Sequence, residues 1–327
     1  MKQNVIVKHF FLSCLLLFAL MLGGCASAAG TPQTESSQTA SPQTSGAASE
    51  KKYVVVTTSF LQDMVKEIAG DSVNVDLIIP AGEDPHLYVA RPEDYEKLEK
   101  ADLVLYHGLH FEGKMSEILE KMGKEISRGF PEDRLNTMEV QGSTVVDPHF
   151  WFDIDLYERA TKNAAEYLSE LLPENQEMYT ANQKAYEEKL KELDAYVAEQ
   201  ISSIPEDSRY LITPHDAFHY FANRYHITVM APQGVSTDSE VSGADIQETI
   251  DFIVAHHIKA VFAESTTDPS RMEKLRQGAA AKGQDIVIVG GEGNELFSDS
   301  LAPAGQPGDN YIDMVKHNVN LMVKNLK

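Results

Sequence analysis

The sequence predicts an α/β protein with two similar lobes, each built on a mostly parallel sheet and joined to the other by one long helix. Three features predict this class. Short β-branched or aliphatic runs alternate with helical stretches, and they do so in two separate sets. A long segment without any strand pattern lies between the sets. The 327 residues also exceed one average domain of about 100–200 residues and suit two lobes.

The first set of elements falls in residues 51–172. Apolar runs predict three strands, at Tyr53–Thr57, Val73–Ile79 and Leu103–Tyr106. Helical stretches follow them, over Ser59–Gly70, Pro92–Lys100 and Gly113–Arg128. Ser59 is the candidate N-cap of the first helix, and Pro92 suits the first position of the second. Alternation of strand and helix is typical of a parallel sheet with helices on both faces.

The second set falls in residues 205–327 and has the same rhythm. Four short apolar runs predict strands, at Tyr210–Thr213, Thr228–Ala231, Ala260–Ala263 and Ile286–Val289. Helical stretches separate these runs, at about 215–225, 243–257 and 269–282. We therefore expect a second parallel sheet in this half of the chain.

The segment between the two sets, residues 155–202, is interrupted by Pro173. After this proline, six apolar residues recur at intervals of 7, 4, 3, 4 and 4, namely Tyr179, Tyr186, Leu190, Leu193, Val197 and Ile201. That spacing places them on one face of a helix, which at about 30 residues would span about 45 Å. An ordinary surface helix has the same stripe. Its position between two α/β sets favours a rigid backbone helix over residues 173–204.

The N-terminus has the pattern of a bacterial lipoprotein signal over residues 1–24. Lys2 and Lys8 precede the apolar run Phe10–Leu22, which is shorter than the about 20 residues of a membrane-spanning helix. The sequence Leu22–Cys25 (LGGC) resembles a lipobox, which makes Cys25 the predicted lipidation site. A plain signal peptide with an incidental cysteine is the alternative. A lipid-anchored protein outside the cytoplasm is expected, on a Gram-positive surface.

The composition excludes several classes of protein. Residues 25–50 hold Ser, Thr, Gln, Ala, Pro and Gly without aromatic or large aliphatic residues, which predicts a disordered tether. Cys14, the only other cysteine, lies in the signal, so the mature chain would hold one lipidated cysteine and can form no intrachain disulfide or thiolate metal site. The formal charge of −22 argues against nucleic-acid binding, because such a surface repels phosphates.

Three of the eleven histidines follow a proline in a loop, namely His86, His149 and His215. His86 and His215 come after predicted strands, and ligands of open α/β sheets bind beyond the carboxyl ends of the strands. The preceding proline restricts the backbone, so each imidazole is rigidly placed. One such histidine is often incidental, but three at similar positions suit a metal site. Asp299, after the last predicted strand, is by itself an ordinary loop residue.

The remaining histidines give no firm assignment. His107 and His110 follow a strand but cannot be placed from the pattern. His219 comes one helical turn after His215 and could pair with it, although exposure or an outer role is the stronger expectation. The others fall in helical or helix-end positions and are expected to be structural or solvated, namely His226, His256, His257 and His317.

Eight segments in order resemble the zinc/manganese solute-binding lipoproteins of ABC importers. They are Val54–Thr58, Asp84–Tyr88, Tyr106–Glu112, Asp147–Asp153, His215–Tyr225, Gln233–Glu240, Phe297–Leu301 and Tyr311–Asn318. The resemblance implies a metal site in the cleft between the lobes. Its implied ligands are His86, His149, His215 and Asp299. It further implies a monomer that serves a permease and an ATPase. Two positions depart from the family, His219 where glycine is common and His107 where asparagine is common.

The metal and the class of activity follow from this ligand set. Imidazole and carboxylate suit both zinc and manganese. Zinc-specialised relatives often carry a His-rich acidic loop, and residues 113–146 contain no histidine, which favours Mn²⁺ over Zn²⁺, with iron as a minor alternative. A zinc hydrolase is disfavoured because a fourth protein ligand fills the open position and no hydrolase motif is present. Glu264 could serve as its base, but a structural role typical of the family is the stronger expectation. Nothing in the sequence supports an adhesin as the primary role.

Overall fold

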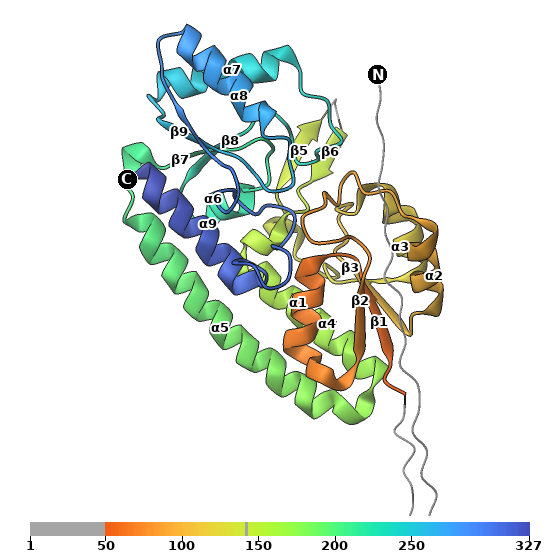
Figure 1. Cartoon of the computed structure of the whole chain (residues 1–327). Helices are drawn as coiled ribbons and strands as arrows, with labels where there is room; N and C mark the ends of the chain where they lie inside the picture. The colour runs from red at the N-terminus through yellow and green to blue at the C-terminus, as the bar shows by residue number, and fades with distance from the viewer. Residues whose placement is uncertain (1–49, 141–142) are drawn as a thin grey trace, which may run out of the picture. The chain divides into compact units, whose positions relative to one another are not determined.

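The computed structural model describes residues 50–140 and 143–327 (Figure 1). The predicted signal peptide, Cys25 and all of the tether except Glu50 lie outside the described residues. Among the helices of the described part, none combines the length and the apolar character needed to cross a bilayer.

The N-terminal sheet has four parallel strands in the order β2-β1-β3-β4. These are β1 (Tyr53–Val56), β2 (Asn74–Leu77), β3 (Leu103–Tyr106) and β4 (Lys124–Glu125). Val54 pairs with Val75 on one side and with Leu103 on the other. β1 lies between β2 and β3, and its last three residues are buried. Such a hydrophobic strand is typical of a parallel sheet whose two faces are covered by helices. These helices include α1 (Ser59–Ala69), α2 (Pro92–Lys100) and α3 (Ser116–Met122).

Two expectations for this lobe are wrong in detail. The N-cap of α1 is Thr58, whose hydroxyl accepts from the Leu61 N–H, and not Ser59. The helix expected over Gly113–Arg128 ends at Met122, and β4 follows it as an edge strand. Gly123 directly follows the helix. Glycine suits this position because a Cβ would lie 2.8 Å from the Tyr106 ring. The hairpin of β5 (Thr137–Val140) and β6 (Ser143–Val146) was not predicted, since its exposed second strand lacks an apolar pattern.

The C-terminal half has four short parallel strands that pair two by two. They are β7 (Tyr210–Ile212) with β8 (Thr228–Met230), and β9 (Ala260–Phe262) with β10 (Val287–Val289). β7 also contacts β9. The helices are α6 (His219–Tyr225), α7 (Gly243–Ala255) and α8 (Ser270–Ala281).

The helix expected from residue 215 begins only at His219. Before it, His215 forms a β-bridge with Gln233, and the Asp216 N–H donates to the Gln233 carbonyl at 3.0 Å. The chain at His215 is therefore extended, so His215 and His219 do not share one helical face, and the half-exposed His219 matches the stronger expectation of exposure or an outer role.

The long helix α5 (Gln176–Ser202) follows α4 (Ile154–Leu171) and a 3₁₀ turn at Pro173–Asn175 (Figure 1). The six residues of the predicted stripe are all buried, with at most 1% exposure. α5 contacts α1 and α4 from the first lobe, and α6 and the last helix α9 (Tyr311–Leu326) from the second. This confirms the predicted architecture of two α/β lobes joined by one long helix.

An ion-pair network fixes α6 to α4 and α5. Arg224 contacts three carboxylates, with Nε 2.7 Å from Asp194, Nη1 3.1 Å from Asp153 and Nη2 3.1 Å from Asp155. The Arg224 side chain is 19% exposed, so part of its charge is removed from water. Its hydrogen bond to Asp155 lowers the pKa of that carboxyl.

Replacing Arg224 by methionine is expected to lower the free energy of unfolding by about 2 kcal/mol at pH 7, because Asp194 loses its cation while Asp153 and Asp155 keep only Arg134. Since the folded-state pKa of Asp155 lies below its unfolded value of about 4, the stabilisation is present above that pH. It is lost as the pH falls through the folded-state pKa. Urea unfolding at pH 7 and below pH 3.5 measures both effects.

The matched control is Lys282→Met, which breaks the exposed pair of Lys282 with Asp251. Exposed pairs contribute about 0–1 kcal/mol, so this variant should unfold almost as the unaltered protein does. Equal losses in the two variants, or a loss at Arg224 that does not diminish in acid, would contradict a structural role of the network.

Candidate metal centre

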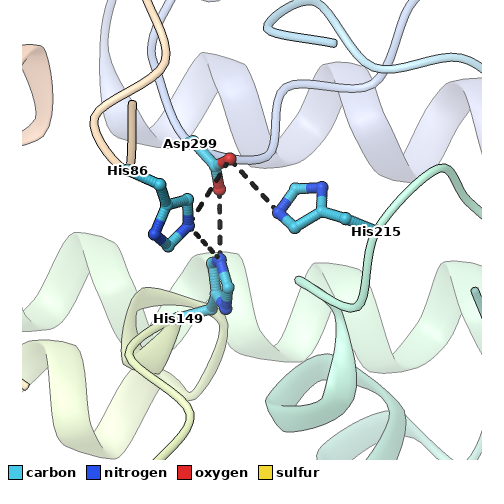
Figure 2. A group of neighbouring side chains, drawn as sticks. All are labelled: His86, His149, His215 and Asp299. Atoms are coloured by element: carbon cyan, nitrogen blue, oxygen red, sulfur yellow. Dashed lines mark hydrogen bonds and ion pairs between the residues drawn. The ribbon is translucent and has the colours of Figure 1, made fainter. Parts of the chain in front are cut away.

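The four ligands implied by the resemblance come together from four loops (Figure 2). His86 follows β2, His149 follows β6, His215 follows β7, and Asp299 lies beyond β10. One nitrogen or oxygen atom of each residue lies within 4.8 Å of those of the others. His86 is 2% exposed and the other three are fully buried. Two of these loops belong to each half of the chain.

The Asp299 carboxylate faces all three imidazoles. Its Oδ1 lies 3.2 Å from His149 Nε2, and its Oδ2 lies 3.2 Å from His215 Nε2 and 4.0 Å from His86 Nε2. The Nε2 atoms of His86 and His149 are 3.4 Å apart. Within the described residues, neither Asp299 oxygen has a hydrogen-bond donor. Buried polar atoms normally have partners, so these oxygens are available to a cation.

The repeated Asp-Pro-His motif has a local structural cause. In the first copy, Asp84 Oδ1 accepts from the His86 N–H at 2.9 Å. In the second, Asp147 Oδ1 accepts from the His149 N–H at 3.0 Å. An Asp side chain that bonds the backbone two residues ahead forms an Asx turn. Each turn therefore fixes its histidine, and Thr237 Oγ1 further holds Asp84 Oδ2 at 2.6 Å.

Two further carboxylates orient the imidazoles from behind. Asp147 Oδ1 lies 2.7 Å from His149 Nδ1, and Glu264 Oε2 lies 2.5 Å from His215 Nδ1. Such contacts fix the tautomer that leaves Nε2 free for a metal and increase its basicity. Asp147 has no role predicted from the sequence, whereas for Glu264 a structural role typical of the family was the stronger expectation than that of a hydrolytic base. Its position just after β9 was the available clue.

The charges within the cluster are strongly coupled. Burial lowers the pKa of His86 to about 3. Burial also disfavours the charged form of His149, but Asp147 and Asp299 raise its pKa to about 9. Burial acts to raise the pKa of Asp299, yet His215 and His149 hold it well below its usual value. The carboxylate is therefore ionised, and a metal competes with protons for the ring nitrogens.

The histidines that the sequence left open lie outside the cluster. His107 is buried, with Nε2 2.7 Å from Thr58 Oγ1, and its ring packs against Phe111 and Trp151. His110 is exposed and has a left-handed backbone (φ 63°). His219 is half-exposed, with Nδ1 3.0 Å from Asp216.

The chain matches the family model described as ZnuA, zinc-uptake complex component A, periplasmic, over residues 54–325. It is 38% identical over 285 residues to the manganese-binding lipoprotein MntA of Bacillus subtilis, covering 86% of this chain and 91% of that protein. It is 40% identical over 283 residues to the zinc-binding protein TroA of Treponema pallidum, covering 85% and 89%.

Solved structures give the same result. The periplasmic TroA of Treponema pallidum superposes with a TM-score of 0.79 at 38% identity, covering 85% of this chain and 99% of that one. A TroA structure concerned with metal-binding specificity gives a TM-score of 0.84 at 59% identity, covering 85% and 100%.

These matches confirm the resemblance found in the sequence. The family consists of solute-binding receptors of ABC importers, so the hydrolase alternative is set aside. The chain belongs to the ZnuA family of periplasmic zinc-uptake components.

Proposed function

We propose that this protein captures one divalent metal ion outside the cytoplasm and delivers it to the permease and ATPase of an ABC importer. The ion would be bound by Nε2 of His86, His149 and His215 and by the Asp299 carboxylate. The observation that supports this most directly is the meeting of four buried ligand atoms within 4.8 Å of one another. The metal is cargo here and has no catalytic part.

We propose Mn²⁺ as the preferred ion. Both oxygens of Asp299 are free of hydrogen-bond donors in the described structure, which suits the oxygen preference of manganese. The relative MntA is named as manganese-binding. Zn²⁺ is the alternative, because imidazole suits zinc, zinc generally binds more tightly than manganese, and TroA is named as zinc-binding.

The location, assembly and domain boundaries form a further part of the proposal. Cys25 would anchor a monomer to the membrane of a Gram-positive cell through the tether at residues 25–50. The folded part would divide into lobes over residues 51–172 and 205–327 and the backbone helix over 173–204. The names of several relatives as substrate-binding lipoproteins support the anchor. The boundaries rest on the sequence pattern and stay a prediction.

Metal-free protein that starts at Ala26 tests the proposal by titration with Mn²⁺ and, separately, with Zn²⁺. An ion at 1,000 times its dissociation constant should add about 4 kcal/mol to the free energy of unfolding and raise the melting temperature accordingly. His86→Ala should lose this shift. His256→Ala, an exposed histidine at the end of α7, should retain it.

The outcomes separate the alternatives. A shift with both ions that is lost only in His86→Ala supports the site and leaves the cellular metal to uptake assays. A shift with zinc alone reverses the preference for manganese. The absence of any shift with either ion would overturn the four-ligand site.

A further inference from the structure

The loop that carries Asp299 follows the strands of the C-terminal half, but three hydrogen bonds of its residues 298–301 lead to the N-terminal lobe. Trp151 Nε1 donates to the Ser298 carbonyl at 3.0 Å. The Leu301 N–H donates to Ser59 Oγ at 3.0 Å, and the Gly82 N–H donates to Ser300 Oγ at 2.7 Å. Residues on both sides of Asp299 are thus bonded to the lobe that also holds His86 and His149.

Trp151, the single tryptophan of the chain, is fixed at its indole N–H and at its backbone carbonyl. The Tyr311 hydroxyl donates to the Trp151 carbonyl at 2.5 Å, while the indole N–H contacts the Asp299 loop. Its fully buried ring stacks on Phe60 with centroids 4.9 Å apart and packs at 4.6 Å from Phe111. A side chain held in this way has a single available position for its N–H.

The loop leaves the C-terminal strands after Leu296, three residues before Asp299. The Leu296 N–H donates to the carbonyl of Ala263, the residue just after β9, at 2.9 Å. The next residue, Phe297, instead donates its N–H to Asn318 of α9 at 2.9 Å. From the same side as β9, Thr266 makes a 3.4 Å hydroxyl contact with Ser298 Oγ. Between Leu296 and Phe297 the support of the loop therefore changes from β9 to α9 of the same half, and its bonds to the N-terminal lobe begin at Ser298.

We propose that Trp151 is a positioning residue for Asp299 and that, through this contact, the N-terminal lobe holds three of the four ligands. The fourth, His215, is oriented by Glu264 beside β9. The lobe then presents two imidazoles and a carboxylate as a preformed set, and His215 completes it from the other half. This inference rests on the proposed metal-binding function and specifies how the site is assembled.

The test is a double-mutant cycle read by Zn²⁺ affinity, measured in competition with a chromophoric chelator. Trp151→Phe keeps an aromatic ring and removes the N–H, and it should weaken zinc binding about 10-fold, the lower end for residues that orient ligands. In an Asp299→Asn background, where three imidazoles still bind zinc, the same change should alter affinity less than 2-fold.

Equal losses in both backgrounds would overturn the proposal, since Trp151 would then act through His149 or through the fold. No loss in either background would overturn it as well. If the unaltered protein bound no zinc, the proposed function itself would have failed, which is a distinct result.

Two more variants keep the test independent of how well Trp151→Phe folds. Ser300→Ala removes the acceptor of the Gly82 N–H and should show the same dependence on Asp299. Thr266→Val is the matched control, because it removes a contact to the same loop from the opposite half and should leave zinc affinity unchanged. Loss of affinity in Thr266→Val equal to that in Ser300→Ala would contradict support from the N-terminal lobe.

Hydrogen exchange without metal offers a second measurement. The Leu301 amide should be protected in the metal-free protein, because its acceptor Ser59 belongs to the N-terminal lobe, to which the loop stays bonded without metal. Amides near His215 should gain protection when zinc is added. Rapid exchange at Leu301 until zinc binds would overturn the preformed set of three ligands.

Discussion

Asp299→Asn is expected to abolish the rise in melting temperature that a saturating concentration of Mn²⁺ produces in the unaltered protein. Asp299 is the only carboxylate among the four proposed ligands, and both of its oxygens face the imidazoles. The amide removes the negative charge that offsets a buried divalent ion, and manganese depends on oxygen ligands more than zinc does. Calorimetric titration with each ion measures the loss, which should be larger for Mn²⁺ than for Zn²⁺.

Glu264→Gln provides a comparison variant, in which a smaller loss of metal affinity is expected than in Asp299→Asn. Glu264 contacts His215 Nδ1 and not the cluster centre, so its loss should weaken binding by about 10–100-fold, less than the loss of the ligand itself. Asp285→Asn, at an exposed carboxylate before β10, should bind metal as the unaltered protein does. Retention of the full Mn²⁺ shift in Asp299→Asn would exclude this carboxylate as a ligand.

Leu190→Ala is expected to lower the free energy of unfolding by about 2–5 kcal/mol, the cost of emptying a fully packed leucine site. Leu190 lies in the middle of the α5 stripe, is fully buried and belongs to the main hydrophobic core, which extends from α1 to α9. Because α5 contacts helices of both lobes, one cavity there weakens the packing that joins them. Chemical denaturation of the metal-free protein measures the change.

The control lies on the exposed face of the same helix. Lys184→Ala keeps the helix propensity and empties no buried space, so its effect should stay within about 0.5 kcal/mol. A loss at Leu190 no larger than at Lys184 would mean that the stripe does not pack as described. If the free energy of unfolding of Leu190→Ala depended less steeply on denaturant concentration than that of the unaltered protein, this would indicate separate unfolding of the lobes.

Much of the fold could be predicted from the sequence because its determinants are local. The helix Pro92–Lys100 and the strand Leu103–Tyr106 begin and end at the predicted residues. The α5 stripe depends on a period of about 3.6 residues, which a single segment contains in full. The predictions failed where a distant part of the chain decided the outcome, as at Gly123, whose neighbour is the Tyr106 ring.

The residues of the candidate site also differ in how far the sequence alone could predict them. The two Asp-Pro-His motifs indicated rigid histidines because an Asx turn forms within three residues. Asp299 gave no comparable pattern and was identified only through the resemblance. Its neighbours His149 and His215 are far away in sequence, and no spacing along the chain encodes such a contact.

The sequence alone determined the two strand–helix sets, the helix between them and the proline-fixed histidines, since each follows from interactions among residues near one another in the chain. The tertiary structure alone decided that Asp147 and Glu264 orient the imidazoles and that Trp151 holds the Asp299 loop against the N-terminal lobe. Most of these contacts join residues 49 to 147 positions apart. They exist only because the sheets and α5 bring separate loops to one place, and that arrangement depends on the packing of the whole folded chain.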